Sequence, residues 1–212
     1  MDLNISAITE AVLKALEKTN ANEGDIPLGI SNRHVHLSKE HVEVLFGAGY
    51  ELTPIKDLVQ PGQYACKEQI TIVGPSLRPI EKVRVLGPVR SASQVEISRT
   101  DAFTLKVAPP VRESGKISGS APITLIGPKG VVTLKEGCII ANRHIHMSLE
   151  DGEKFGVKDN EYVDVDAVGE RRTRFFDVQV RVHKDFRLEM HLDTDDANAA
   201  GLKNGDKLSI VK

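Results

Sequence analysis

A six-residue segment that contains two histidines occurs twice in this chain, at positions 110 residues apart. The first copy is RHVHLS at 33–38 and the second is RHIHMS at 143–148. In an extended strand, side chains at positions i and i+2 point to the same face of the sheet. Each copy therefore predicts a strand that carries two imidazoles side by side, which is half of a metal site. The two copies hold four of the seven histidines, which argues against a chance repeat.

A short helix is expected directly after each copy of the repeat. Ser38 and Ser148 end the two copies, and serine suits the N-cap position because its hydroxyl accepts a backbone N–H bond of the first turn. The dipeptides Phe46-Gly47 and Phe155-Gly156 then close the two helical runs.

The rest of the chain predicts many short strands joined by tight turns. With no Trp and only 4% aromatic residues, the core must consist of Val, Ile and Leu, while 17 Gly and 10 Pro supply turns. A short helix is expected at 195–200, and residues 50–64 are expected to form an irregular connection. Strands are predicted at 26–30, 69–73, 82–86, 94–98, 121–126, 131–134, 138–141, 162–168, 175–182 and 207–211. This pattern predicts a mainly β fold of small barrels and excludes the long βαβ alternation of a Rossmann fold.

Composition excludes several classes of protein. A net charge of −2 gives no electrostatic reason to expect binding to nucleic acid or to a membrane surface. The two cysteines, Cys66 and Cys138, lack a CxxC spacing, which argues against a disulfide framework or a cysteine-rich zinc site. No signal peptide or transmembrane run is visible, so a cytosolic protein is expected.

The N-terminal residues 2–20 predict an amphipathic helix, because apolar residues recur there at nearly helical spacing. A polar stretch at 19–25 follows and is typical of a linker. Two interpretations stay open for this helix. It either packs on its own domain, or it is a detachable tag whose apolar face binds a groove of a partner protein.

Two further residues are candidates to complete the metal sites. His191 alternates with apolar neighbours in LEMHLD, and His144, His146 and His191 would form a three-histidine set that leaves one metal position open. Glu96 lies in the apolar setting Val95-Glu96-Ile97 and is the candidate third ligand for His34 and His36. The alternatives are that Glu96 forms an ion pair or faces solvent, and that each His-x-His lines an exposed strand face. His41 and His183 are expected to be ordinary surface residues.

An anionic substrate is indicated by Arg90. It lies among small and polar residues shortly before Glu96, and a guanidinium matches phosphate or carboxylate in two parallel hydrogen bonds. Arg33 and Arg143 precede the two His-x-His pairs and alternate to the opposite face, so a structural role is expected for them.

The motifs SNRHVHLS at 31–38, RHIHMS at 143–148, the block 86–101 and the block 188–201 resemble the PduL-type phosphate propanoyltransferase (phosphotransacylase) family. The resemblance extends from about Ile26 to the last strand. It implies two small β-barrel domains with short capping helices. One barrel, of residues 23–33 plus 142–212, would be discontinuous in sequence, and residues 34–141 would form the other. Residues 1–22 would form the N-terminal helix and its linker. This helix resembles the encapsulation peptides of bacterial microcompartments.

The resemblance also implies an activity and a set of site residues. The family exchanges acyl-CoA plus phosphate for acyl phosphate plus CoA, with propanoyl-CoA or acetyl-CoA as substrate, and it uses two zinc ions. One ion would be held by His34, His36 and Glu96, and the other by His144, His146 and His191. Arg90 matches the phosphate-binding arginine, and CoA contacts are expected at His191 and at Ser31, Asn32, Arg33, Lys56, Arg84, Phe103 and Asn198. Partners would be the substrates, a second copy of the chain in a homodimer, and microcompartment shell or core proteins. The protein would be located in the bacterial cytoplasm. It would lie inside a microcompartment if the N-terminal helix acts as an encapsulation tag.

The hypothesis for the reaction is direct attack of phosphate on the thioester in a ternary complex, since no Ser/His/Asp or reactive-cysteine arrangement is evident. A covalent route through Cys138, six residues before His144, stays open. Two other classes are alternatives. The same ligands could activate water in a dizinc hydrolase of a phosphoester or amide, or the protein could be a non-catalytic metal-binding scaffold.

Overall fold

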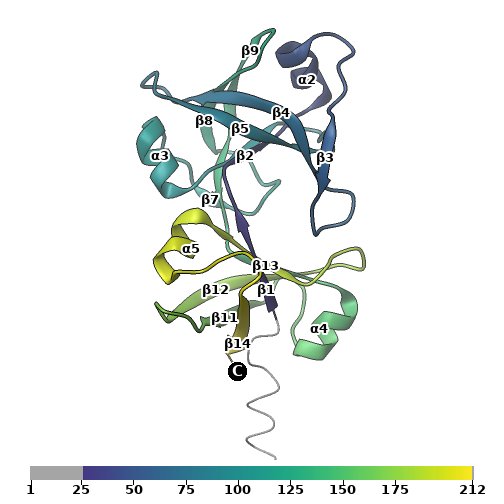
Figure 1. Ribbon diagram of the computed structural model, residues 1–212, viewed down its shortest axis with the longest axis vertical. Helices are drawn as coiled ribbons and strands as arrows, with labels where there is room; N and C mark the ends of the chain where they lie inside the picture. Colours follow the sequence, from purple (N-terminus) through teal and green to yellow (C-terminus); the bar gives the residue numbers. More distant parts are fainter. Residues whose placement is uncertain (1–25, 212) are drawn as a thin grey trace, which may run out of the picture.

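A computed structural model of the chain describes residues 26–211, and these residues form two β-barrels stacked end to end (Figure 1). The prediction of a mainly β fold with two small barrels and short helices, one barrel discontinuous in sequence, is confirmed. The expected N-terminal helix and its linker lie outside the described residues. None of the helices within 26–211 is long and apolar enough to cross a bilayer.

The middle barrel is a closed ring of six strands from the centre of the sequence. Its strands pair in the order β4–β5–β2–β6–β9–β8, and β8 returns to β4 to close the ring. The two short strands β3 and β7 pair with the outer edges of β4 and β9. The bounds are β2 His34–His36, β3 Pro54–Asp57, β4 Tyr64–Val73, β5 Pro79–Gly87, β6 Gln94–Glu96, β7 Val111–Arg112, β8 Ala121–Ile126 and β9 Val131–Ala141.

The terminal barrel joins the first strand to the last third of the chain. Its closed order is β1–β13–β10–β12–β11–β14, with β14 paired back to β1. The first strand therefore belongs to the lower body in Figure 1, and the chain then passes upward into β2 of the middle barrel. The bounds are β1 Ile26–Ser31, β10 His144–Met147, β11 Tyr162–Ala167, β12 Thr173–Val182, β13 Glu189–Asp193 and β14 Lys207–Val211.

Within residues 26–211, four short helices cover the barrels, and side-chain caps fix where they begin. Ser38 and Ser148 cap the first turns of α2 (Lys39–Phe46) and α4 (Leu149–Phe155), which end at Gly47 and Gly156 as the sequence predicts. Each helix follows a His-x-His strand, so the cap also fixes the direction in which the chain leaves that strand. The remaining helices are α3 (Arg99–Leu105) and α5 (Thr194–Ala200).

Each barrel has its own apolar core. In the middle barrel, Val35 and Val95 lie inside the ring, and the neighbouring histidines and Glu96 project to its other face. In the terminal barrel, Ile145 and Met190 are the corresponding core residues. Side chains alternate along each strand, so the apolar residue that separates two polar residues in the sequence points into the core. The histidines and Glu96 point the other way, toward the junction of the barrels.

Several predicted boundaries are wrong. Residues 50–64 include the strand β3, all of whose residues are exposed. The predicted strand 94–98 ends at Glu96, because Ser98 is the N-cap of α3, a helix that the sequence pattern did not indicate. The predicted strands 131–134 and 138–141 are one continuous strand, β9, whose Gly137 has a φ of 137°.

Candidate metal centre and anion site

The two barrels build the same three-residue arrangement in the same strand register. In the middle barrel β2 runs antiparallel to β6, and His34 lies opposite Glu96. In the terminal barrel β10 runs antiparallel to β13, and His144 lies opposite His191. Glu96 and His191 therefore occupy equivalent positions beside the two His-x-His strands.

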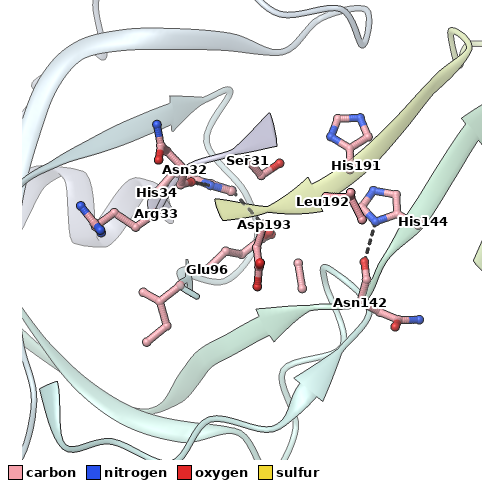
Figure 2. A pocket seen from close by; sticks show the side chains of 12 residues that line it. Ser31, Asn32, Arg33, His34, Glu96, Asn142, His144, His191, Leu192 and Asp193 are labelled. Atoms are coloured by element: carbon pink, nitrogen blue, oxygen red, sulfur yellow. Dashed lines mark hydrogen bonds and ion pairs between the residues drawn. The ribbon is translucent and has the colours of Figure 1, made fainter. Parts of the chain in front are cut away.

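The metal-binding atoms of each set lie close together. In the first ligand set (His34, His36 and Glu96) and in the second ligand set (His144, His146 and His191), one ligand atom per residue lies within 4.8 Å of the other two. Figure 2 shows that His34 and Glu96 face His144 and His191 across the junction of the barrels. The structure thus brings together all six residues that were predicted to bind metal.

Hydrogen bonds leave one nitrogen of each histidine available. Nδ1 of His34 bonds to the carbonyl oxygen of Asn32, and Nδ1 of His144 bonds to that of Asn142, both at 2.8 Å (Figure 2). These backbone bonds fix the ring orientation and leave Nε2 to act as a metal ligand. Three other nitrogens are buried without a hydrogen-bond partner, namely Nδ1 of His36, Nδ1 of His146 and Nε2 of His191. Buried polar atoms normally have a partner, so this donor set fits metal ions.

The pKa values of three histidines and of Glu96 are shifted in the direction that suits metal binding. Burial, with the charge of His34 and Arg90, lowers the pKa of His36 to about 3. Burial and neighbouring imidazoles lower the pKa of His144 to about 4 and that of His146 to about 2. Burial opposes ionisation of Glu96, but its contact with the His34 imidazole outweighs burial and holds the pKa of Glu96 below its ordinary value. The same contact outweighs burial at His34 and raises the pKa of that imidazole. Neutral imidazoles and an ionised carboxylate are the forms that bind metal.

A cavity of about 290 Å³ joins the two ligand sets. All six ligand residues line it, so a small molecule inside would contact both barrels. The remaining lining residues are Ser31, Leu58, Gln60, Gln63, Leu86, Arg90, Ser114, Arg181 and Phe186.

Two residues that the sequence analysis missed hold Glu96 in place. Gln94 Nε2 donates to Glu96 Oε1 at 2.6 Å, and the Ser114 hydroxyl donates to the same oxygen at 2.8 Å. The other oxygen, Oε2, is left facing His34 Nε2 at 3.5 Å. Gln94 lies two residues before Glu96 on one strand and could have been found from that spacing, whereas Ser114 comes from a distant loop without any sequence signal.

Arg90 lies at the cavity without an anionic partner. Its guanidinium donates to Ser114 Oγ at 3.2 Å, and within residues 26–211 no carboxylate lies within 4.0 Å of it. Burial, with a contribution from Arg181, lowers the pKa of Arg90 even though Glu96 opposes the shift. A half-buried arginine whose charge is uncompensated favours binding of an anion.

The arginines that precede the repeats form the ion pairs expected of a structural role. Arg33 pairs with Asp101 of α3, with N–O distances of 2.9 and 2.7 Å. Arg143 pairs with Asp196 of α5, at 2.6 and 2.8 Å. Each pair joins the start of a His-x-His strand to the helix that follows the third ligand.

Of the eight residues expected to contact CoA, His191 belongs to the second ligand set, three others lie beside the ligands and four lie apart. Ser31, Asn32 and Arg33 line a small hollow with His34, Glu96, His144 and His191 (Figure 2). The four others do not line this hollow or the 290 Å³ cavity. Arg84 donates to the carbonyl oxygens of Cys66 and Lys67, Lys56 and Asn198 are exposed, and Phe103 is 72% exposed with Lys106 Nζ 3.8 Å from its ring centroid.

Neither cysteine has the surroundings of a nucleophile. Both are fully buried in the core of the middle barrel. Burial raises the pKa of the Cys66 thiol to about 11 and that of the Cys138 thiol to about 12. His41 differs from the prediction of a plain surface residue, because it is half-buried and its Nδ1 bonds to Ser93 Oγ at 2.7 Å.

The fold and the site together define a class of protein. It is a two-barrel protein with paired metal-type ligand sets and an anion-binding arginine at one inter-barrel cavity.

Comparison with known proteins gives the family. The family model described as phosphate propanoyltransferase matches residues 27–203. Proteins named phosphate propanoyltransferase are similar along nearly the whole chain. The one from Lachnoclostridium phytofermentans is 56% identical over 99% of both chains. That from Thermotoga maritima is 59% identical over 90% of both, and that from Priestia megaterium is 52% identical over 95% of this chain and 93% of its own. The chain belongs to the phosphate propanoyltransferase family and is an acyltransferase enzyme.

Proposed function

We propose that this enzyme interconverts a short-chain acyl-CoA plus phosphate with an acyl phosphate plus CoA, at a site that holds two zinc ions. The observation that supports this proposal most directly is the shared cavity. Two complete ligand sets and the unpaired Arg90 line the same space of about 290 Å³. That volume suits phosphate and the reacting end of a thioester, while the rest of CoA extends outward past Ser31–Arg33.

Different residues of the cavity would bind the phosphate and the metal ions. Arg90, from the middle barrel, holds the phosphate, and Arg181, from the terminal barrel, adds a second positive charge to the same cavity. When bound, the zinc ions supply positive charge that orients the phosphate and offsets the negative charge that develops on the reacting oxygens. Ser114 connects Arg90 to Glu96 by hydrogen bonds, so it couples the anion site to the first ligand set.

The proposed step is direct transfer. A phosphate oxygen bonds to the thioester carbonyl carbon, the C–S bond breaks, and the sulfur leaves as the CoA thiolate. Holding both substrates in one cavity converts this reaction into an intramolecular one. The burial of Cys66 and Cys138 in the core supports a route without an acyl-enzyme. Propanoyl and acetyl chains differ by one methylene, which is worth only about 1–3 kcal/mol of discrimination, so we propose propanoyl-CoA as the main substrate and acetyl-CoA as a second.

The test is acyl-CoA consumption by the purified protein with and without inorganic phosphate, together with its metal content. The proposal expects free CoA to appear only when phosphate is present, and two zinc ions per chain. Thioester or phosphoester loss without phosphate dependence would indicate a dizinc hydrolase instead. Zinc binding without turnover would indicate a scaffold protein, and a protein that neither binds zinc nor turns over would contradict the interpretation of the repeat.

We further propose that residues 1–22 direct the enzyme into a bacterial microcompartment from the bacterial cytoplasm, and that the enzyme is a homodimer. Both proposals rest on the resemblance alone. Fusing residues 1–22 to a fluorescent protein tests the first, because the fusion should co-purify with shells that the untagged fluorescent protein does not enter. Sedimentation of the purified chain tests the second.

A further inference from the structure

The two ligand sets differ by one negative charge. The first set contains the carboxylate of Glu96, whereas the second set consists of three histidines, and histidine binds metal as the neutral imidazole. A dication in the second set would therefore lack a compensating charge among its ligands, and Arg181, which lies opposite His146, is itself a cation paired with Glu113 at 3.5 Å. Uncompensated charge in a buried site is unfavourable, so a nearby anion is needed.

The strand register places a carboxylate beside the second ligand set. Gln94 lies two residues before Glu96 and opposite His36. At the equivalent position of the terminal barrel, Glu189 lies two residues before His191 and opposite His146. In both barrels this side chain contacts the third ligand, since Gln94 Nε2 lies 2.6 Å from Glu96 Oε1 and Glu189 Oε2 lies 3.0 Å from His191 Nε2.

Each barrel therefore has one glutamate in this pair of positions. In the middle barrel the glutamate is the third ligand itself, and in the terminal barrel it lies two residues before the third ligand. In the middle barrel the ligand is the anion and its neighbour is the neutral Gln94. In the terminal barrel the ligand is the imidazole of His191 and its neighbour is the carboxylate side chain of Glu189. This arrangement keeps one carboxylate beside each proposed ion.

The contact of Glu189 with His191 leaves the ligand nitrogen available. The carboxylate oxygen lies 3.0 Å from Nε2 but out of line for a hydrogen bond, so Nε2 has no hydrogen-bond partner. The side chain of Glu189 is only 13% exposed, which strengthens its electrostatic effect on the neighbouring ring.

Gly29 provides the space that Glu189 occupies. It lies on β1 directly beside His191. A Cβ at position 29 would lie 2.6 Å from Glu189 Oε1 and 2.8 Å from its Cδ. The φ angle of Gly29 is not positive, so the backbone does not require glycine there and the reason for it is steric.

We propose that Glu189 is the charge-balancing carboxylate of the second ligand set, and that Gly29 is needed to admit it. The inference rests on the proposed two-metal function and deepens it. A carboxylate that lies beside the ligand nitrogen offsets the charge of a bound dication, and losing an outer-shell partner of a metal site typically costs about 10–100-fold in affinity.

The first test is Glu189→Gln, which keeps the shape of the side chain and removes its charge. Zinc affinity is measured by chelator competition on the full-length protein, and the ligand geometry by the visible spectrum of the cobalt-substituted protein. One of the two ions should bind about 10–100-fold more weakly, while the other binds as in the wild type. Glu51→Gln, which removes an exposed carboxylate of the middle barrel, is the matched control and should change neither ion.

The second test is Gly29→Ala, which leaves Glu189 in the chain but displaces it, and which decides the question if Glu189→Gln does not fold. It should weaken the same ion, and combining the two substitutions should add little to either alone. Gly169→Ala, at a glycine with open space around it, is the control. Wild-type affinity for both ions in Glu189→Gln, or equal weakening of both, would overturn the inference. A wild-type protein that binds no zinc would instead contradict the proposed function.

Discussion

At the scale of single residues, Arg90 is the side chain whose loss should act on one substrate alone. It has no carboxylate partner among the described residues and is held over the cavity by Ser114. Arg90→Ala should raise the KM for phosphate roughly 10- to 100-fold, because charge-assisted hydrogen bonds are worth about 1.5–3 kcal/mol. Arg90→Lys should have an intermediate effect, since it keeps the charge but loses the planar fork. Steady-state kinetics with each substrate varied in turn would measure both.

The KM for CoA separates this role from a general loss of structure. It should change by less than about threefold in Arg90→Ala. Arg78→Ala, which removes an exposed arginine of the β4–β5 hairpin, is the control. An equal rise in both KM values would argue that Arg90 shapes the cavity rather than binds phosphate.

Cys138 should be dispensable for the chemistry. It is fully buried in the middle barrel, and burial raises the pKa of its thiol to about 12, so a thiolate is not accessible near neutral pH. Cys138→Ala should keep kcat within about twofold and lower the free energy of unfolding by about 1 kcal/mol. A loss of kcat by a factor of about 100 or more, with normal zinc content and normal thermal melting, would revive a covalent route.

At the scale of secondary-structure elements, the sequence predicted the ligand residues of the site better than it predicted the strand pairing that brings them together. The His-x-His strands and Glu96 follow a period of two, which is local information and can be read without a structure. The pairing of His34 with Glu96 depends on the register of β2 against β6, which no local pattern specifies. Ser114 reaches Glu96 only because its loop passes over β6, and that path is set by tertiary packing.

The elements that were missed are those with the weakest periodicity. The two-residue strand β7 and the fully exposed strand β3 bury no alternating face. The helix α3 spans only seven residues, and it is fixed by the reciprocal capping bonds of Ser98 and Asp101. Those two residues form a recognisable capping box. It was missed because Ser98 directly follows apolar strand residues and was assigned to the predicted strand 94–98.

One element-scale prediction concerns Glu68, which anchors β4 to the segment before β3. Its carboxylate accepts the Tyr50 hydroxyl at 2.8 Å and the Thr53 N–H at 3.1 and 3.2 Å, and Glu68 is 6% exposed. Glu68→Ala removes these hydrogen bonds, and because Tyr50 and Thr53 are exposed to water we expect a loss of only about 0.5–1.5 kcal/mol in the free energy of unfolding. Urea unfolding at pH 7 would measure it, with the exposed Glu81→Ala of β5 as control.

The same residue has a predicted pH dependence. Burial opposes ionisation of Glu68, but hydrogen bonds from the backbone, Thr53 and Tyr50 outweigh it and lower the pKa of Glu68 in the folded protein. A lowered carboxyl pKa stabilises the fold above the unfolded value of about 4.3, and this stabilisation is lost as the pH falls through the lower folded value. Glu68→Gln should therefore unfold with a shallower pH dependence below about pH 4.3, and a slope equal to that of the wild type would contradict this account.

At the scale of the whole molecule, the site exists only while the two barrels stay together, because each contributes one ligand set. The loop before β4 and the loop before β13 hold them at one edge of the cavity. Gln60 donates from Nε2 to the carbonyl oxygen of Arg187 at 2.9 Å, and its Oε1 accepts the N–H of the same residue at 3.1 Å. Gln60 is 4% exposed, so its amide binds the opposite barrel in the manner of a strand partner.

Gln60→Ala should therefore loosen the junction without unfolding either barrel. It leaves the N–H and C=O of Arg187 without their partner, a local loss of about 1–3 kcal/mol. Hydrogen exchange at the Arg187 amide should accelerate by roughly 5- to 150-fold on that basis, while the amides of β5 and β12 stay protected. The value of kcat/KM should fall because the cavity opens, and the exposed Gln69→Ala of β4 should change neither quantity. If the Arg187 amide kept its protection in Gln60→Ala, the barrels would be held by other contacts, such as the bond from the Thr100 N–H to Asp195 Oδ2 at 2.7 Å and the Arg181–Glu113 ion pair at 3.5 Å.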